Sequence, residues 1–445
     1  MALETWLVKV KTAISKHNKM AKKSHVGILA FEIAGLMTKL QYLWQSLSDK
    51  NIQVVPFEGV RKIVSNDETF LLSLACAEIV ENLRVIAKSV SRFGEKSNDS
   101  SLRCFERLFE EFANSNRDPH CWVLCWKEME AKQKKMEHYV TITANLYREI
   151  DELSEVEHGL KKLLQLQCSN SSSSSSTISN DNLKKLCELE KKVFWQRQEV
   201  KYLKESSLWN RSFDMITLLL ARSVFTVFAR IKLVFGIGSH GSLQRSLSVL
   251  AAVYPLENSQ LERQEQIKKF FRSNSKLLKP PPTTLGAAAF SLHYANVIIV
   301  LEKMIKSPHL VGIDARDDLY GMLPTSVRVS LRGRLRGVGF SASDPVLAGE
   351  WRDALGKILS WLSPLAHNMI KWQSERSFEQ QNLMPRTNVF LLQTLFFANQ
   401  AKTEAAITEL LVGLNYIWRF EREMNAKTLL ECSNINGYQN LPNSD

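Results

Sequence analysis

The chain has 445 residues and a formal net charge of +12, and 44% of its residues are hydrophobic and 23% charged. These proportions are typical of a globular protein with a real core. The positive charge favours an anionic partner, such as a lipid surface or an acidic protein, or reflects only a basic surface. No uncharged apolar run approaches the roughly 18 residues that span a bilayer, which excludes a transmembrane helix.

Glycine and proline are scarce, at 18 and 12 residues, and this scarcity favours long helices over many short strands. No convincing alternation of apolar and polar residues occurs, so we expect an all-α protein. The first predicted element is a basic amphipathic segment, residues 1–25. Trp6, Leu7, Lys9 and Lys11 in it are candidate contacts with an anionic membrane, although a solvated terminal helix explains the pattern equally well.

Residues 26–117 are predicted to form an N-terminal helical domain, a small bundle. Apolar side chains recur at steps of four and three residues from Leu29 to Leu47 and again from Leu72 to Val90. This is the spacing of helices with one buried face. A third amphipathic helix, residues 101–114, completes the expected bundle.

Residues 118–235 are predicted to form a long helical hairpin and one following helix. Apolar residues keep a heptad-like rhythm from Tyr139 to Leu164 and from Leu183 to Leu203, on either side of a serine-rich segment, residues 168–181. Two such helices around a polar tip indicate an antiparallel coiled-coil-like hairpin. The serines of the tip are candidate phosphorylation sites, and so this is expected to be a phosphoprotein.

A flexible basic linker is predicted for residues 236–283, and it ends in a run of three prolines. Arg245 lies three residues before Ser248, which is a candidate phosphorylation site within this linker. Residues 284–425 are predicted to form a C-terminal helical domain, and residues 426–445 a disordered tail.

Seven cysteines in irregular spacing, with no signal peptide before them, predict reduced thiols in the cytosol or nucleus. Cys121 and Cys125 lie four residues apart beside His120. No second pair of ligands has the spacing of a zinc site, so we expect both cysteines in the core on a helix. The sequence predicts no metal and no cofactor.

The densest charge lies in "DARDD", residues 314–318, which holds Asp314, Asp317 and Asp318. Aspartate-rich helical motifs bind magnesium and a diphosphate in some all-α enzymes, and carboxylates suit magnesium. However, Asp314 is placed to cap the helix that follows, and the adjacent Asp317 and Asp318 diverge by about 100° on a helix. No second acidic motif follows.

A second interpretation is that the acidic cluster only fixes a corner. Pro324 ends the short acidic helix, and Thr325 is placed to cap the next one. On that next helix Arg328, Arg332 and Arg336 recur every four residues. We favour an ion-pair network between these arginines and Asp314, Asp317 and Asp318, with an anion-binding surface as the alternative and magnesium-dependent catalysis as a remote one.

No serine-histidine-aspartate order, nucleophile elbow, dinucleotide fingerprint or kinase set occurs. We therefore predict no enzyme, no catalytic residue and no small-molecule substrate. Protein partners are expected, an anionic membrane surface is an alternative partner, and nucleic acid is not expected.

Two long stretches carry a family resemblance. Residues 26–49 read "VGILAFEIAGLMTKLQYLWQSLSD", and residues 284–336 read "TLGAAAFSLHYANVIIVLEKMIKSPHLVGIDARDDLYGMLPTSVRVSLRGRLR". They resemble the two plant-specific domains of unknown function in the phytosulfokine-simulator family, in the order in which that family has them. The resemblance spans about residues 26–84 and 280–370.

The resemblance implies a plant protein that promotes vegetative growth and is linked to peptide-hormone and brassinosteroid signalling, with no known catalytic residue to carry over. It implies residence in the nucleus, or at the plasma membrane for members that begin with Met-Gly and resemble N-myristoylated proteins. This chain begins Met1-Ala2, so that motif is absent. We expect a helical scaffold or adaptor in the nucleus or cytoplasm, with a peripheral membrane or phosphoinositide-binding module as the alternative.

Overall fold

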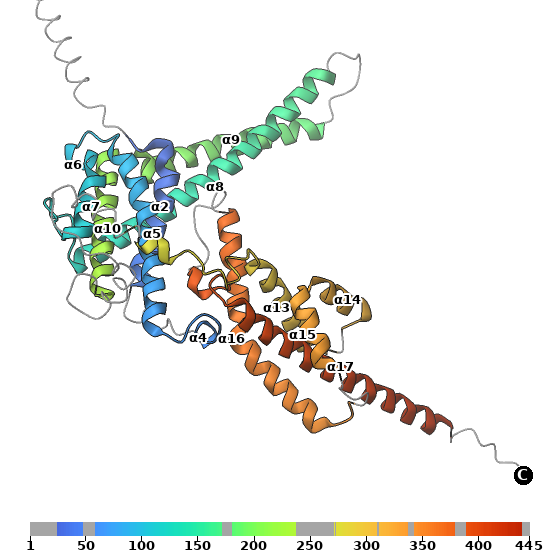
Figure 1. The fold of residues 1–445 in the computed structure, drawn as a ribbon. Helices are drawn as coiled ribbons and strands as arrows, with labels where there is room; N and C mark the ends of the chain where they lie inside the picture. Colours follow the sequence, from blue (N-terminus) through green and yellow to red (C-terminus); the bar gives the residue numbers. More distant parts are fainter. Residues whose placement is uncertain are drawn as a thin grey trace, which may run out of the picture.

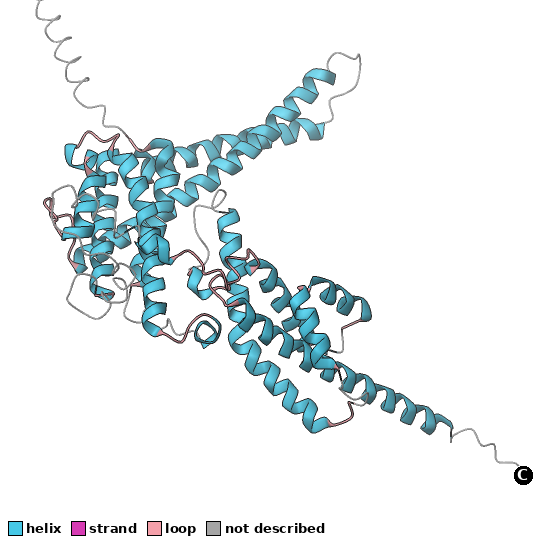
Figure 2. Cartoon of the chain, in the orientation of Figure 1, coloured by secondary structure: helices cyan, strands magenta, loops and turns pink. Residues whose placement is uncertain are grey.

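The computed structural model describes residues 25–47, 58–170, 180–236, 271, 273–308, 311–336, 342–378 and 389–437. Within these ranges all regular structure is helical (Figure 2), and the only β-type pairings are two isolated bridges. The predicted all-α class is confirmed. None of the described helices is long and apolar enough to cross a membrane.

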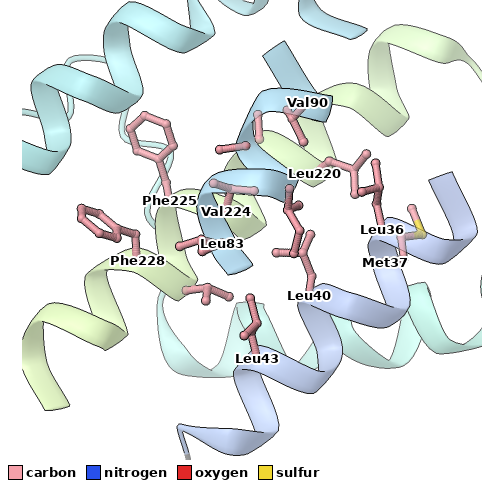
Figure 3. Packing of buried hydrophobic residues seen from close by; sticks show 14 of the residues in the cluster. Leu36, Met37, Leu40, Leu43, Leu83, Val90, Leu220, Val224, Phe225 and Phe228 are labelled. Carbon is pink, nitrogen blue, oxygen red and sulfur yellow. The ribbon is translucent and has the colours of Figure 1, made fainter. Parts of the chain in front are cut away.

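The N-terminal core is built on α2 (Ala30–Ser46), α5 (Glu68–Gly94) and α10 (Phe213–Val234). The short helices η1 (Gly27–Leu29), α6 (Ser100–Arg103) and α7 (Phe105–Ser115) complete this end of the molecule. Figure 3 shows Leu40 of α2, Leu83 of α5 and Val224 of α10 meeting in the centre, and all three are fully buried. The apolar stripes at steps of three and four therefore do converge on one core, as their spacing predicts.

An aromatic cluster forms part of this core where α7 packs on α10. Phe112 of α7 stacks on Phe225 of α10 with ring centroids 4.9 Å apart, and Trp122 meets Phe225 edge-on at 5.0 Å. Trp122 belongs to a non-helical segment that leads into α8. Asp118 accepts a hydrogen bond from Val123 N, and Thr226 accepts one from Leu124 N, so this segment is held against α10. Cys121 and Cys125 are exposed in this segment. The prediction that they lie in the core on a helix is therefore wrong.

Helices α8 (Trp126–Asn170) and α9 (Asn180–Ser206) form a hairpin that projects from the bundle (Figure 1). Its base is anchored by buried Leu146, Val200 and Leu203, and η2 (Leu208–Asn210) leads back into α10. Farther out, Arg197 of α9 pairs with Glu157 of α8 at 2.8 Å. The serine-rich tip falls largely outside the described residues.

The C-terminal core is formed by α13 (Ser291–Lys306), α14 (Ile313–Met322), α15 (Thr325–Leu335), α16 (Pro345–Phe378), η4 (Leu391–Gln393) and α17 (Gln400–Gly437). Helix α16 packs between α13 and α17, and α15 packs against α17. Helix α17 continues to Gly437 (Figure 1), so the first part of the predicted disordered tail is helical. Ala426, Lys427 and Leu429 there are good helix formers with no breaker among them.

Helix α5 belongs to both cores. Leu71 and Leu74 near its start pack into the C-terminal core together with Val60 and Ile63 of α4 (Glu58–Ile63). The rest of the apolar stripe of α5, from Cys76 to Phe93, belongs to the N-terminal core. Helix α5 therefore links the two cores, because an unbroken helix of this length extends beyond a single core.

Candidate functional site

The segment "DARDD" forms the first half of α14 after Ile313, and its three aspartates form no ion pair with the arginines of α15. Asp314, Asp317 and Asp318 are exposed, and within residues 311–336 none of them forms an ion pair with Arg328, Arg332 or Arg336. The predicted ion-pair network is thus absent from this corner. Charges on an exposed surface gain little by pairing, since water already solvates them.

The two predicted caps are also wrong. The residue before α14 is Gly312, so Asp314 lies inside the first turn and its side chain forms no capping hydrogen bond. Helix α15 begins at Thr325 itself, after Pro324, and its first turn has no side-chain cap. A proline directly before the first helical residue fixes the extended backbone that precedes the helix, which leaves Thr325 already inside the helix.

Arg328 holds the corner through backbone carbonyls instead. Its Nε donates to Leu323 O at 2.7 Å and its guanidinium to Gly321 O at 3.0 Å. These carbonyls lie at the C-terminal end of α14, where a cation is favoured by the helix dipole. His293 of α13 reaches the same end, with Nε2 2.8 Å from Met322 O. The corner is therefore fixed by C-terminal capping of α14.

The arginine inside the motif, Arg316, faces inward. Its guanidinium carbon lies 3.7 Å from the centroid of the Trp418 ring on α17, which is close cation–π stacking. Its Nε is buried and has no hydrogen-bond partner in the described part of the chain. Sequence reasoning missed this residue, because its partner lies about a hundred residues farther along the chain.

A cavity of about 320 Å³ opens beside this stack, between α14, α15 and α17, with Met304 of α13 at its edge. Its walls are mostly apolar. Arg316, Asp317 and Arg332 line it together with Asn415 and Trp418. Of the six residues predicted as an anion-binding or ion-pair set, the structure brings only Asp317 and Arg332 to this cavity.

The geometry does not support a metal centre at this corner. Among the described residues, no three histidine, cysteine, aspartate or glutamate side chains are arranged to hold a metal ion. Asp314 and Asp318 are exposed and do not line the cavity, and Asp317 alone among the three aspartates lines it. This cavity therefore offers a cation a single carboxylate.

The remaining predicted sites lie outside the described residues. These are the candidate membrane contacts Trp6, Leu7, Lys9 and Lys11 and the candidate phosphorylation site Ser248. Arg336 of the predicted stripe is described and exposed, at the end of α15.

Comparison with known protein families gives one match in each half of the chain. Residues 28–79 match a domain of unknown function, DUF3475, and residues 284–371 match a protein family of unknown function, DUF668. Protein PSK SIMULATOR 1 and Protein PSK SIMULATOR 3 of Arabidopsis thaliana are each 27% identical to this chain over 414 residues, which is 89% of this chain and 56% of theirs. Protein PSK SIMULATOR 2 is 26% identical over 420 residues, 60% of its length.

The chain is a homologue of the PSK simulator proteins. It spans a little over half the length of these relatives. No solved structure matches it. The first matched domain contains α2, α4 and the start of α5, and the second contains α13, α14, α15 and much of α16. The second therefore supplies three of the four helices that line the cavity, and α17 lies beyond it.

Proposed function

We propose that this chain is a non-enzymatic helical scaffold or adaptor in plant growth regulation, linked to peptide-hormone and brassinosteroid signalling. The growth role is supported by the homologous proteins, which are named as simulators of PSK, the phytosulfokine peptide. Both matched domains have no assigned activity. The observation that carries the scaffold role is the hairpin of α8 and α9, which presents aromatic side chains to solvent away from both cores.

Three aromatic residues of α9 are open to solvent. Phe194 is 57% exposed, Trp195 69% and Tyr202 64%. Trp195 and Tyr202 are seven residues apart and thus share one face of the helix. Aromatic side chains of this kind dominate the energetics of protein interfaces, so this face is suited to a helix of a protein partner.

The hairpin holds this face in place before a partner arrives. Val200 and Leu203 are buried against α8, and Arg197 is paired with Glu157 across the two helices. A surface that is already ordered loses less conformational entropy on binding. The hairpin is therefore a better docking element than an equally apolar loop.

The test is a double substitution, Trp195→Ser with Tyr202→Ser, in the full chain. The matched control is Lys192→Ser with Glu199→Ser, which has the same spacing on the same helix, leaves the net charge unchanged and alters exposed positions. Both are expressed in plant tissue and captured under identical conditions with quantitative identification of partners. We expect the control to retain signalling proteins of peptide-hormone or brassinosteroid responses, and the aromatic variant to lose them.

Equal capture of such proteins by both variants would contradict the scaffold role of the hairpin. The membrane alternative is tested separately by sedimentation with anionic vesicles at physiological salt. The scaffold proposal expects the chain to stay in the supernatant, since Arg328 of the cationic stripe is already bonded to carbonyl oxygens. Sedimentation with the vesicles would favour a peripheral membrane module instead.

A further inference from the structure

The cavity between α14, α15 and α17 has the size and lining of a small-molecule site. Its volume of about 320 Å³ lies within the range of ligand pockets, and such pockets are apolar with a few placed polar groups. The apolar walls come from α13, α14, α15 and α17 and from the residues that flank α14: Met304, Val311, Leu319, Leu323, Leu331, Leu335, Leu411 and Leu414.

The polar groups of the cavity carry a net positive charge. Arg316 and Arg332 supply two guanidinium groups, and Asp317 supplies one carboxylate. The guanidinium of Arg316 lies over the Trp418 ring, and its buried Nε has no hydrogen-bond partner in the described chain. A buried donor left without an acceptor costs free energy, so a ligand that offers an acceptor here gains more than one that does not.

We propose that this cavity binds a small amphipathic carboxylate, with its apolar body among the leucines and its carboxylate on Arg316, assisted by Arg332. A guanidinium presents paired N–H donors in the plane that a carboxylate needs. A single negative charge balances the net charge of the lining, whereas a dianion exceeds it. This inference is independent of the hairpin, and it goes beyond the scaffold role, for which no small-molecule ligand was predicted.

The test compares octanoate with 1-octanol, which has the same apolar chain but no charge, in titrations of the full chain followed by ligand-observed NMR. We expect one octanoate site per chain, bound about tenfold tighter than 1-octanol, because a hydrogen bond to a charged group contributes more than a neutral one. No saturable binding of octanoate at millimolar concentrations would overturn the proposal. Equal affinity for the two probes would overturn the role assigned to Arg316.

Two variants and a control locate the site. Arg316→Gln should weaken octanoate about tenfold and leave 1-octanol unchanged, while Leu335→Trp should fill the cavity and weaken both. Arg334→Gln is the control, because Arg334 lies on α15 but is paired with Glu409 at 2.9 Å and does not line the cavity. If Arg316→Gln lowers the folded content by circular dichroism, Arg332→Gln replaces it, with a smaller selective loss of octanoate expected. Unchanged octanoate binding in both Leu335→Trp and the arginine variants would place the binding elsewhere and contradict the proposal.

Discussion

Glu78 is the side chain through which α5 holds the segment before α17, and its removal should be costly. Glu78 is only 7% exposed, and its two carboxylate oxygens accept hydrogen bonds from the backbone N–H groups of Leu391 and Leu392 at the start of η4. Beside this contact, Phe390 packs on Tyr42 of α2 with ring centroids 5.7 Å apart. These contacts tie residues more than three hundred positions apart.

Glu78→Ala leaves both amides without this acceptor. A hydrogen bond to a charged group contributes about 1.5–3 kcal/mol, and part of this is offset because the carboxylate no longer has to be buried, so we expect a loss of about 3 kcal/mol in the free energy of unfolding. The amides of Leu391 and Leu392 should lose protection from hydrogen exchange by about a hundredfold, since each 1.4 kcal/mol is a factor of ten.

The assay is urea unfolding together with hydrogen exchange read by mass spectrometry on peptides that contain η4. The control is Glu68→Gln on the same helix, where the carboxylate is 72% exposed and its ion pair with Arg61 spans 3.7 Å. It should change the free energy of unfolding by no more than about 0.5 kcal/mol. Unchanged stability and unchanged exchange of η4 in Glu78→Ala would refute the assigned link.

Three further predictions concern buried charge and close packing. Burial lowers the pKa of Lys232 from 10.5 to about 8. Between pH 8 and pH 10.5 the unfolded chain therefore holds a proton on Lys232 that the folded chain has released. The free energy of unfolding should rise with pH across this range by up to ~3 kcal/mol. Urea unfolding across pH 8–10.5 checks this, and an equal rise in Lys232→Met would contradict it. Burial alone would raise the pKa of Glu302, but hydrogen bonds from Lys306 and His367 hold it at about 2. Its contribution, reduced by solvent screening to about 2 kcal/mol, should be present above pH 4.5 and lost toward pH 2, and should be missing in Glu302→Gln. A Cβ at Gly59 would lie 2.3 Å from Trp361 O, so Gly59→Ala should lower the free energy of unfolding by about 1–3 kcal/mol. At Gly356 an added Cβ meets nothing within 4 Å, so Gly356→Ala should be neutral or stabilising. Equal effects of the two substitutions in urea unfolding would rule out the close approach of α4 to α16.

The sequence predicted the helices better than their partners. The stripe from Leu29 to Leu47 and the rhythm that produces α8 and α9 depend on residues three and four positions apart, which a helix brings together regardless of the rest of the chain. These patterns do not show which face of one helix packs against which face of another. The contact of Glu78 with η4 and the sharing of α5 between two cores therefore had no local signal.

The candidate site shows the same limit. The sequence "DARDD" predicts a site made of three aspartates. The residue of this segment that faces inward is instead the arginine between them, because it stacks on Trp418 of α17. From sequence alone, an arginine within an acidic run is predicted to be one more exposed charge. Only the packing of α14 against α17 distinguishes Arg316 from its neighbours.

The claim that this protein acts by contact rests on the exposed aromatic face of the hairpin, and growth itself is its most direct readout. Plants that lack the native protein are supplied with the wild-type chain, with the Trp195→Ser/Tyr202→Ser variant, or with the Lys192→Ser/Glu199→Ser control, at matched protein levels. Our account predicts that the wild type and the control restore growth and that the aromatic variant does not, although it remains folded. Full restoration of growth by the aromatic variant would contradict it.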